Sequence, residues 1–256
     1  MIVDETSHPL LVLVLSFIVL ALSARLGLFF GKRWRLPEGG VRDDFSIIQG
    51  ATLTLLGLII GFTFSMALNR YDQRKNLEEE ETNAIGTEYV RASLLPPADA
   101  SKVRHLLVAY LDQRIAFYEA RAVDELSKVD RQTAKLQADL WSAVQAPAVA
   151  QPSPIVALAV AGMNDVLNSQ GYTQAAWWNR IPLAAWGMMA LIAICSNVLV
   201  GFGARDAKRE SKLLLILPLV VAIAFFLIAD IDSPRGGPIR VQPQNLINLA
   251  SSLRAQ

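Results

Sequence analysis

The chain alternates between long apolar stretches and one extended region that is rich in charged residues. Residues 46–68 contain no Asp, Glu, Lys or Arg, and a helix of about 20 apolar residues crosses the hydrocarbon layer of a bilayer. Three further apolar stretches cover about 9–30, 182–203 and 213–229. The pattern therefore predicts four membrane-spanning helices that lie in a lipid bilayer.

The region between the second and third spans, residues 69–180, places apolar residues at helical spacing among many charges. The first prolines after the second span are Pro96 and Pro97, so we expect that span to continue as one helix to about residue 94. Three more helices are expected: one after Asp99 or Ser101, one that starts near Leu126 and ends near Pro147, and one over about 155–169 before Gly171.

These patterns predict an all-α integral membrane protein with four transmembrane helices and a helical extramembrane bundle inserted between spans 2 and 3. The expected segments are an N-terminal transmembrane hairpin (1–68), a helical extramembrane domain whose first helix continues span 2 (69–180), a C-terminal transmembrane hairpin (181–230) and a tail with a short helix (231–256).

One side of the second span consists of small residues. At about 100° per residue, Gly50, Thr54, Gly57, Gly61 and Ser65 fall within one narrow arc of the helix. Small residues let helix backbones approach closely in lipid, and the Gly57-xxx-Gly61 spacing is typical of such contacts. Two interpretations are open: this face packs against another helix, or it lines a polar path through an oligomer. Both require a neighbouring helix, so we expect a homo-oligomer.

Two polar residues lie within other spans. Arg25 stands near the end of the first span, shortly before the basic sequence GKRWR. Its side chain either extends to the nearby interface or faces a pore. Asn197 lies in the third span and acts either as a hydrogen-bond partner between helices or as an ion ligand.

Four consecutive glutamates, Glu78, Glu79, Glu80 and Glu81, follow the second span. Consecutive residues point around the whole circumference of a helix, so at most two of them share a face. A solvated surface is the simpler interpretation. If an oligomer gathers this helix around an axis, however, one glutamate from each subunit forms an acidic collar that changes the local concentration of ions.

Composition argues against several classes of function. The net charge is +1, from 24 basic and 23 acidic residues, which argues against a nucleic-acid partner. One cysteine, Cys195, and two distant histidines, His8 and His105, provide neither a disulfide framework nor the spacing of a metal site. The sequence also lacks a nucleophile elbow and a phosphate-binding glycine loop. We therefore predict no enzyme activity, no metal and no cofactor.

Basic residues favour one orientation in the membrane. Loops 31–45 and 204–212 carry four Lys or Arg residues each, whereas residues 1–8 carry none. Short loops rich in Lys and Arg usually face the cytoplasm. In a bacterial inner membrane this orientation places the helical domain and both termini in the periplasm.

Two stretches resemble a known family. The sequence GLIIGFTFSMALNRYDQRKNLEEEETNAIGTEYVRASLLP, which begins at Gly57, resembles the signature of the bestrophin-like domain proteins. The sequence IDSPRGGPIRVQPQNL, with Asp232, Pro234, Gly237 and Val241, is similar to the end of the same family. The spans, the inserted helices and the tail agree as well, so the resemblance covers nearly the whole chain.

This family is distantly similar to the bestrophins, which are pentameric anion channels whose second spanning helix lines the pore with a neck of apolar side chains. The resemblance implies that Phe62 and Phe64 are the nearest equivalents of neck residues. Bestrophins also bind calcium through an acidic cluster just after the last span, where this chain has Asp230 and Asp232 followed by Arg235. They keep the inserted domain in the cytoplasm, opposite to the orientation that the basic loops predict.

The leading hypothesis is therefore an oligomeric ion pathway in which the second span lines or packs around the central axis. The alternative is a membrane-anchored sensor or scaffold whose helical bundle binds a ligand or a protein partner.

Overall fold

The computed structural model describes residues 8–34, 40–204 and 212–255, and within these ranges the regular structure is helical with no strand. The chain divides into two compact units. The first comprises Met1–Arg70 and Arg180–Arg240, and the second comprises Tyr71–Asn179 and Val241–Gln256. The acidic N-terminus, residues 35–39 and most of the basic loop at 204–212 lie outside the described residues.

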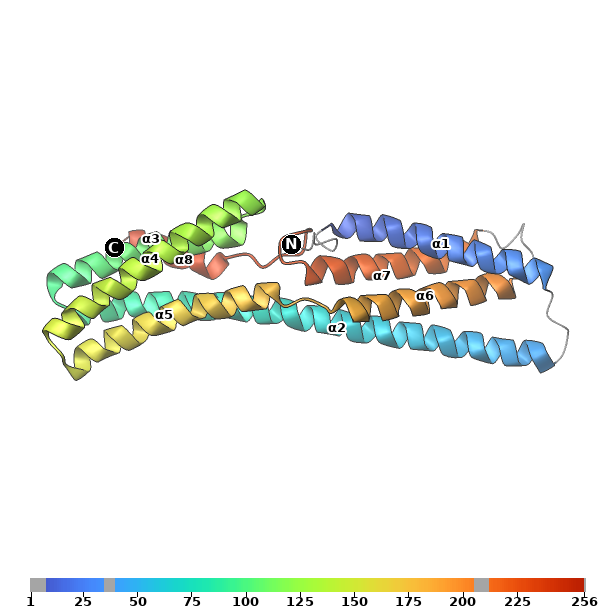
Figure 1. The fold of residues 1–256 in the computed structure, drawn as a ribbon, viewed down its shortest axis with the longest axis horizontal. Helices are drawn as coiled ribbons and strands as arrows, with labels where there is room; N and C mark the ends of the chain where they lie inside the picture. Colours follow the sequence, from blue (N-terminus) through green and yellow to red (C-terminus); the bar gives the residue numbers. More distant parts are fainter. Residues whose placement is uncertain (1–7, 35–39, 205–211, 256) are drawn as a thin grey trace. The chain divides into compact units, whose positions relative to one another are not determined.

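Helix α2 is the longest element and runs without a break over Gly40–Arg91, 52 residues (Figure 1). At 1.5 Å per residue it is about 78 Å long. A short 3-10 helix, η2 (Ala92–Leu94), follows it. The helix ends here because Pro96 and Pro97 cannot donate helical hydrogen bonds and disfavour the helical conformation in the residue before them. Residues of α2 belong to both units.

The first unit contains α1 (Pro9–Arg33), α6 (Leu183–Gly203) and α7 (Ile216–Asp232), besides the first part of α2. Helix α1 packs against both α6 and α7, and the three lie side by side in Figure 1. Their outer surfaces carry large exposed apolar side chains, which are characteristic of helices that face lipid. Four helices of the described chain are long and apolar enough to cross a membrane.

Glycines bring α1 and α6 into direct backbone contact. A Cβ on Gly27 would lie 2.8 Å from the carbonyl carbon of Val198, and one on Gly31 would lie 2.5 Å from the carbonyl oxygen of Phe202. From the other side, a Cβ on Gly201 would lie 2.8 Å from the carbonyl carbon of Ala24. The Gly27-xxx-Gly31 spacing, rather than Gly57-xxx-Gly61, therefore carries the close helix contact within one chain.

The last apolar helix begins later than its sequence indicates. A short 3-10 helix, η3 (Leu213–Leu215), precedes α7, so Pro218 lies in the first turn of α7. From the sequence, a proline within this apolar stretch is expected to kink the helix unless neighbouring groups satisfy the freed carbonyl. In the first turn its missing N–H has no helical acceptor to lose, so the proline is accommodated there.

The second unit contains α3 (Pro97–Glu119), α4 (Val123–Ala150), α5 (Pro154–Trp178) and the C-terminal α8 (Gln244–Arg254), besides the second part of α2. Each helix contributes side chains that are almost completely buried to one shared core. Representative members are Ile85, Leu107, Leu111, Leu140, Met163 and Leu246.

Two helices of this unit are longer than the sequence indicates. Helix α4 continues past Pro147 to Ala150, because a proline so close to the end loses only one helical hydrogen bond and its side chain is buried. Helix α5 continues past Gly171 to Trp178. A glycine inside a helix costs about 1 kcal/mol, and the buried residues Thr173 and Trp177 beyond it anchor the extension.

Candidate functional site

The small-residue face of α2, defined by Gly50, Thr54, Gly57, Gly61 and Ser65, is exposed along its whole length. A Cβ added at any of its three glycines would meet no other atom within 4 Å. Within the same span Leu56, Thr63 and Ala67 are the buried residues, at 3%, 5% and 0% exposure. The contacts of α2 within the first unit therefore use another side of the helix and leave the small-residue face without a neighbour.

The two aromatic residues in this span also point away from the core of the chain. Phe62 is 63% exposed and Phe64 is 38% exposed. Like the small-residue face, these two side chains are therefore available to contact lipid or another molecule.

The polar residues of the other spans occupy different surroundings. Arg25 is exposed on α1. Asn197 is fully buried on α6, and its Nδ2 donates to the carbonyl of Ala193, one turn earlier in the same helix, at 2.8 Å. Its Oδ1 has no hydrogen-bond partner among the described residues. Within that part of the chain Asn197 thus bonds to its own helix and not to another.

The four consecutive glutamates separate into two pairs. Glu79 and Glu80 are exposed, as a solvated surface requires. Glu78 and Glu81 are 1% and 0% exposed, so the expectation of a solvated surface is wrong for these two. They lie three residues apart on the side of α2 that faces the core of the second unit, where packing outweighs the preference of carboxylates for water.

Glu81 is the acceptor of a buried network that joins three helices. Its carboxylate forms an ion pair with the Arg114 guanidinium on α3. The hydroxyl of Tyr118 donates to it at 3.4 Å, and that of Thr173 on α5 at 3.2 Å. Burial, and next the charge of Glu81, raise the pKa of the Tyr118 hydroxyl, which therefore remains a donor. Because both charges are buried and paired, this network acts as a structural tie between α2, α3 and α5.

Glu78 caps the N-terminus of α8. Its Oε1 accepts from the backbone N–H groups of Asn245 and Leu246 at 3.0 and 3.1 Å. The side-chain amide of Asn245 donates to Oε2 at 2.6 Å. A carboxylate at this place satisfies orphan N–H groups and interacts favourably with the helix dipole. Glu78 thereby anchors the C-terminal helix to α2.

A further buried carboxylate, Glu88, lies two turns beyond Glu81 and is 0% exposed. Sequence reasoning missed it, although a signal existed. Buried residues recur every three or four positions along the end of α2 and into η2, at Arg74, Glu78, Glu81, Ile85, Glu88 and Ala92. Since Ile85 and Ala92 share this helical face, its polar members are expected to be buried as well.

The two aspartates after the last span are held by nearby backbone. Asp232 accepts from the N–H of Ile181 at 3.1 Å and pairs with Arg70 at 3.4 Å. Asp230 accepts from the N–H of Ile239 at 3.1 Å. Both carboxylates thus hold segments of the first unit together: Asp232 binds α2 and the segment before α6, and Asp230 binds the segment after α7.

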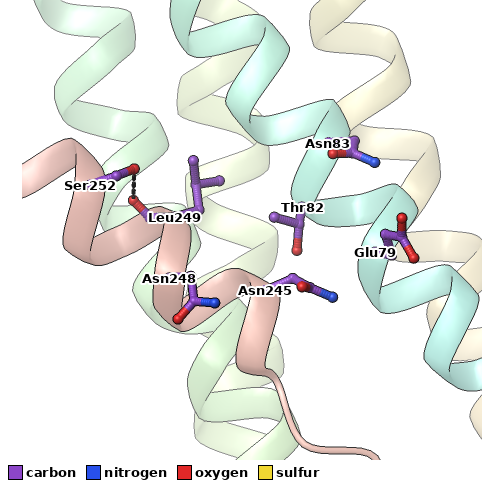
Figure 2. A pocket seen from close by; sticks show the side chains of 7 residues that line it. All are labelled: Glu79, Thr82, Asn83, Asn245, Asn248, Leu249 and Ser252. Atoms are coloured by element: carbon purple, nitrogen blue, oxygen red, sulfur yellow. Dashed lines mark hydrogen bonds between the residues drawn. The ribbon is translucent and has the colours of Figure 1, made fainter.

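Figure 2 shows a polar pocket between α2 and α8. Its volume is about 360 Å³, and one carboxylate, three amides and two hydroxyl groups contribute to its walls. The lining residues are Glu79, Thr82, Asn83, Asn245, Asn248, Leu249 and Ser252. Four of these groups already take part in hydrogen bonds. Asn245 donates to the carboxylate of Glu78, and Ser252 donates to the carbonyl of Leu249. Thr82 donates to the carbonyl of Glu78, and Asn248 accepts from the side-chain amide of Gln244. The remaining groups suit a small polar molecule with donors for the carboxylate of Glu79.

Comparisons with known proteins agree on the fold. The model of the Bestrophin-like domain matches residues 10–246, whereas no curated protein matches the chain. Crystal structures of a bacterial bestrophin homologue from Klebsiella pneumoniae are similar. A variant with a tyrosine replaced by alanine is 11% identical, with a TM-score of 0.65 over 93% of this chain and 99% of that one. The structure obtained by Zn-SAD phasing is 14% identical, with a TM-score of 0.61 over 95% of each chain.

At these identities the structural likeness establishes the fold alone. The family model, in contrast, covers most of the chain and includes all four apolar helices. This multi-pass membrane protein therefore belongs to the Bestrophin-like domain family.

Proposed function

We propose that this protein forms an oligomeric ion pathway in the bacterial inner membrane, with the small-residue face of α2 lining or packing around the central axis. One observation carries the proposal: Gly50, Gly57 and Gly61 have no atom within 4 Å of an added Cβ. A continuous strip of small residues that one chain leaves bare is suited to close approach by helices of other copies. The resemblance to bestrophins, whose second spanning helix lines a pore, supports the same role.

Ion flux through purified protein in liposomes is the direct test. We expect flux above that of empty liposomes, measured over a range of pH, voltage and calcium concentration. Absence of flux under every one of these conditions would refute the ion pathway.

Assembly through the small-residue face has a matched control on α6. Gly187 is exposed and, like Gly57, has no atom within 4 Å of an added Cβ. Gly57→Leu should reduce the oligomer mass measured by light scattering in detergent, because a bulky side chain prevents close approach of helices. Gly187→Leu should leave that mass unchanged. Equal oligomer masses for the two variants would contradict assembly through this face.

Cysteine accessibility separates lining from packing. With the exposed Cys195 replaced by serine, Gly61→Cys should react with a water-soluble thiol reagent and lose flux if the face lines the path. If the face packs between subunits, oxidation should instead join subunits by disulfides while the reagent has no effect on flux.

In this proposal the second unit lies outside the bilayer, in the periplasm. Support comes from the basic loops at 31–45 and 204–212 and from the change in α2 from the uncharged stretch 46–68 to a charged one. Labelling of Thr87→Cys in intact cells by a reagent that does not cross membranes tests the orientation. Labelling that occurs only after lysis would place this unit in the cytoplasm.

A second candidate function is that of a membrane-anchored sensor or scaffold whose helical bundle binds a ligand or partner. The pocket between α2 and α8 favours it, because the carboxylate of Glu79 and the amide of Asn83 line a volume of about 360 Å³. Native mass spectrometry of the purified protein should then detect a bound small molecule that is lost in Asn83→Leu. Such a molecule, combined with an absence of flux, would favour this function over the first.

A further inference from the structure

Glu88 differs from the other buried carboxylates of α2. It lies beyond the uncharged stretch 46–68, it is 0% exposed, and neither of its oxygens has a hydrogen-bond partner among the described residues. Glu78 and Glu81, in contrast, each accept at least three hydrogen bonds. An ionised carboxylate buried without such bonds is strongly unfavourable. The surroundings of Glu88 therefore favour its neutral form.

A glycine on α5 provides the space that Glu88 occupies. A Cβ on Gly162 would overlap Oε2 of Glu88 and would lie 2.7 Å from Nη1 of Arg91. The carboxyl group thus packs directly against the backbone of α5. Any other residue at position 162 would displace one of these two side chains.

The charges around Glu88 do not neutralise it. Arg91, one turn further along α2, lies 4.0 Å from Asp165 of α5 and is half-buried. Arg104 of α3 is engaged elsewhere, because its Nε donates to the carbonyl of Tyr89 at 3.2 Å. Burial raises the pKa of the Glu88 carboxyl to about 8; Arg91 opposes this rise and Asp165 adds to it. Two acids therefore compete for one arginine.

We propose that Glu88 is a proton-binding site that controls how firmly α5 packs on α2. In the protonated state the neutral carboxyl group rests against Gly162, and Arg91 remains near Asp165. Loss of the proton places an uncompensated charge in the contact between the helices. The carboxylate then attracts Arg91 away from Asp165, and α5 loosens locally.

The direction of the pH effect follows from the raised pKa. Between the ordinary value of 4.5 and about 8 the folded protein keeps a proton that the unfolded chain has released. The stability contributed by this site is therefore complete below 4.5 and is lost as pH rises through about 8. This expectation concerns the packing of the second unit and holds whether or not the protein conducts ions.

Hydrogen–deuterium exchange of the full chain in detergent tests the proposal. Protection of peptides from α5, corrected for the intrinsic pH dependence of exchange, should be at least about tenfold lower near pH 9 than near pH 6. Glu88→Gln, which mimics the neutral acid, should abolish this difference. Glu80→Gln, an exposed change on the same helix, should retain it. Equal protection of the wild type at both pH values, or persistence of the difference in Glu88→Gln, would overturn the proposal.

An exposed substitution keeps the test decisive if Glu88→Gln folds poorly. Asp165 is exposed on α5, and Asp165→Asn removes the negative charge that raises the pKa of Glu88 while it frees Arg91. The midpoint of the loss of protection should therefore move to lower pH. A midpoint that is unchanged or higher would contradict the competition of two acids for Arg91.

Discussion

The contact between α1 and α6 yields the most quantitative prediction, because glycine backbones meet there on both sides. Gly201→Ala places a Cβ 2.8 Å from the carbonyl carbon of Ala24 and 3.0 Å from the amide nitrogen of Leu28. Carbon atoms in favourable contact lie about 3.5–4.0 Å apart. The two helices must therefore move apart to accommodate a single methyl group.

The expected loss of stability is the balance of two effects. Forcing an extra methyl group into a packed contact costs about 1–3 kcal/mol, and the closeness of backbone atoms, which cannot rotate away, places Gly201 at the upper end. Replacing glycine by alanine inside a helix contributes about 1 kcal/mol in the opposite direction. We therefore expect Gly201→Ala to destabilise the protein by about 1–2 kcal/mol, or by about 2–8 °C in unfolding temperature for a chain of this size.

Thermal unfolding of the full chain in detergent measures this effect. Gly187→Ala on the same helix is the control, because an added Cβ there meets no atom within 4 Å, and it should leave the unfolding temperature unchanged or raise it. Gly27→Ala, which tests the same contact from α1, should behave like Gly201→Ala. The reasoning is refuted if Gly201→Ala unfolds at the same temperature as Gly187→Ala.

Three further predictions concern buried carboxylates, each measured by unfolding or proteolysis of the full chain. Glu81→Ala should destabilise the protein by about 3–5 kcal/mol, because it leaves the buried guanidinium of Arg114 unpaired. The exposed control Glu80→Ala should change the stability by less than about 0.5 kcal/mol. Equal effects of the two variants would disprove the buried network. Glu78→Ala should weaken the anchoring of α8 by about 1–2 kcal/mol and should speed proteolytic cleavage just before this helix. Glu79→Ala should cause neither effect. An unchanged cleavage rate in Glu78→Ala would argue against capping of α8 by Glu78. Asp232→Ala should destabilise by about 1–3 kcal/mol, because a buried backbone N–H and an arginine lose their acceptor, and a wild-type unfolding temperature would contradict this role.

The sequence alone indicated which stretches are apolar enough to cross a membrane. That property depends on composition over about 20 consecutive residues, so no tertiary contact is needed to recognise it. The all-helical character follows equally from the local pattern. Helix ends were harder to locate, because Pro147, Gly171 and Pro218 are tolerated where burial or position within a turn compensates for them.

Helical spacing also showed that Gly50 to Ser65 form one face, but spacing cannot tell which faces meet. The Gly57-xxx-Gly61 pattern is bare in the single chain, whereas Gly27-xxx-Gly31 makes the close contact. Both patterns fit the same rule. The choice between them depends on which helix lies opposite, which is a property of the tertiary structure.

The acidic residues of α2 also show what the sequence determines and what depends on the tertiary structure. The sequence determined that four consecutive glutamates point in different directions around the helix. At most two of them can therefore share a face. The spacing of Ile85 and Ala92 places Glu78 and Glu81 on the same side of the helix. Only the fold decided that other helices cover this side, so that Glu78 and Glu81 are buried while Glu79 and Glu80 are exposed. The partners of Glu78 come from α8, 167 and 168 residues further along the chain, and those of Glu81 come from α3 and α5. Because the groups that cover and bind these carboxylates are so distant in sequence, no local pattern could have identified them.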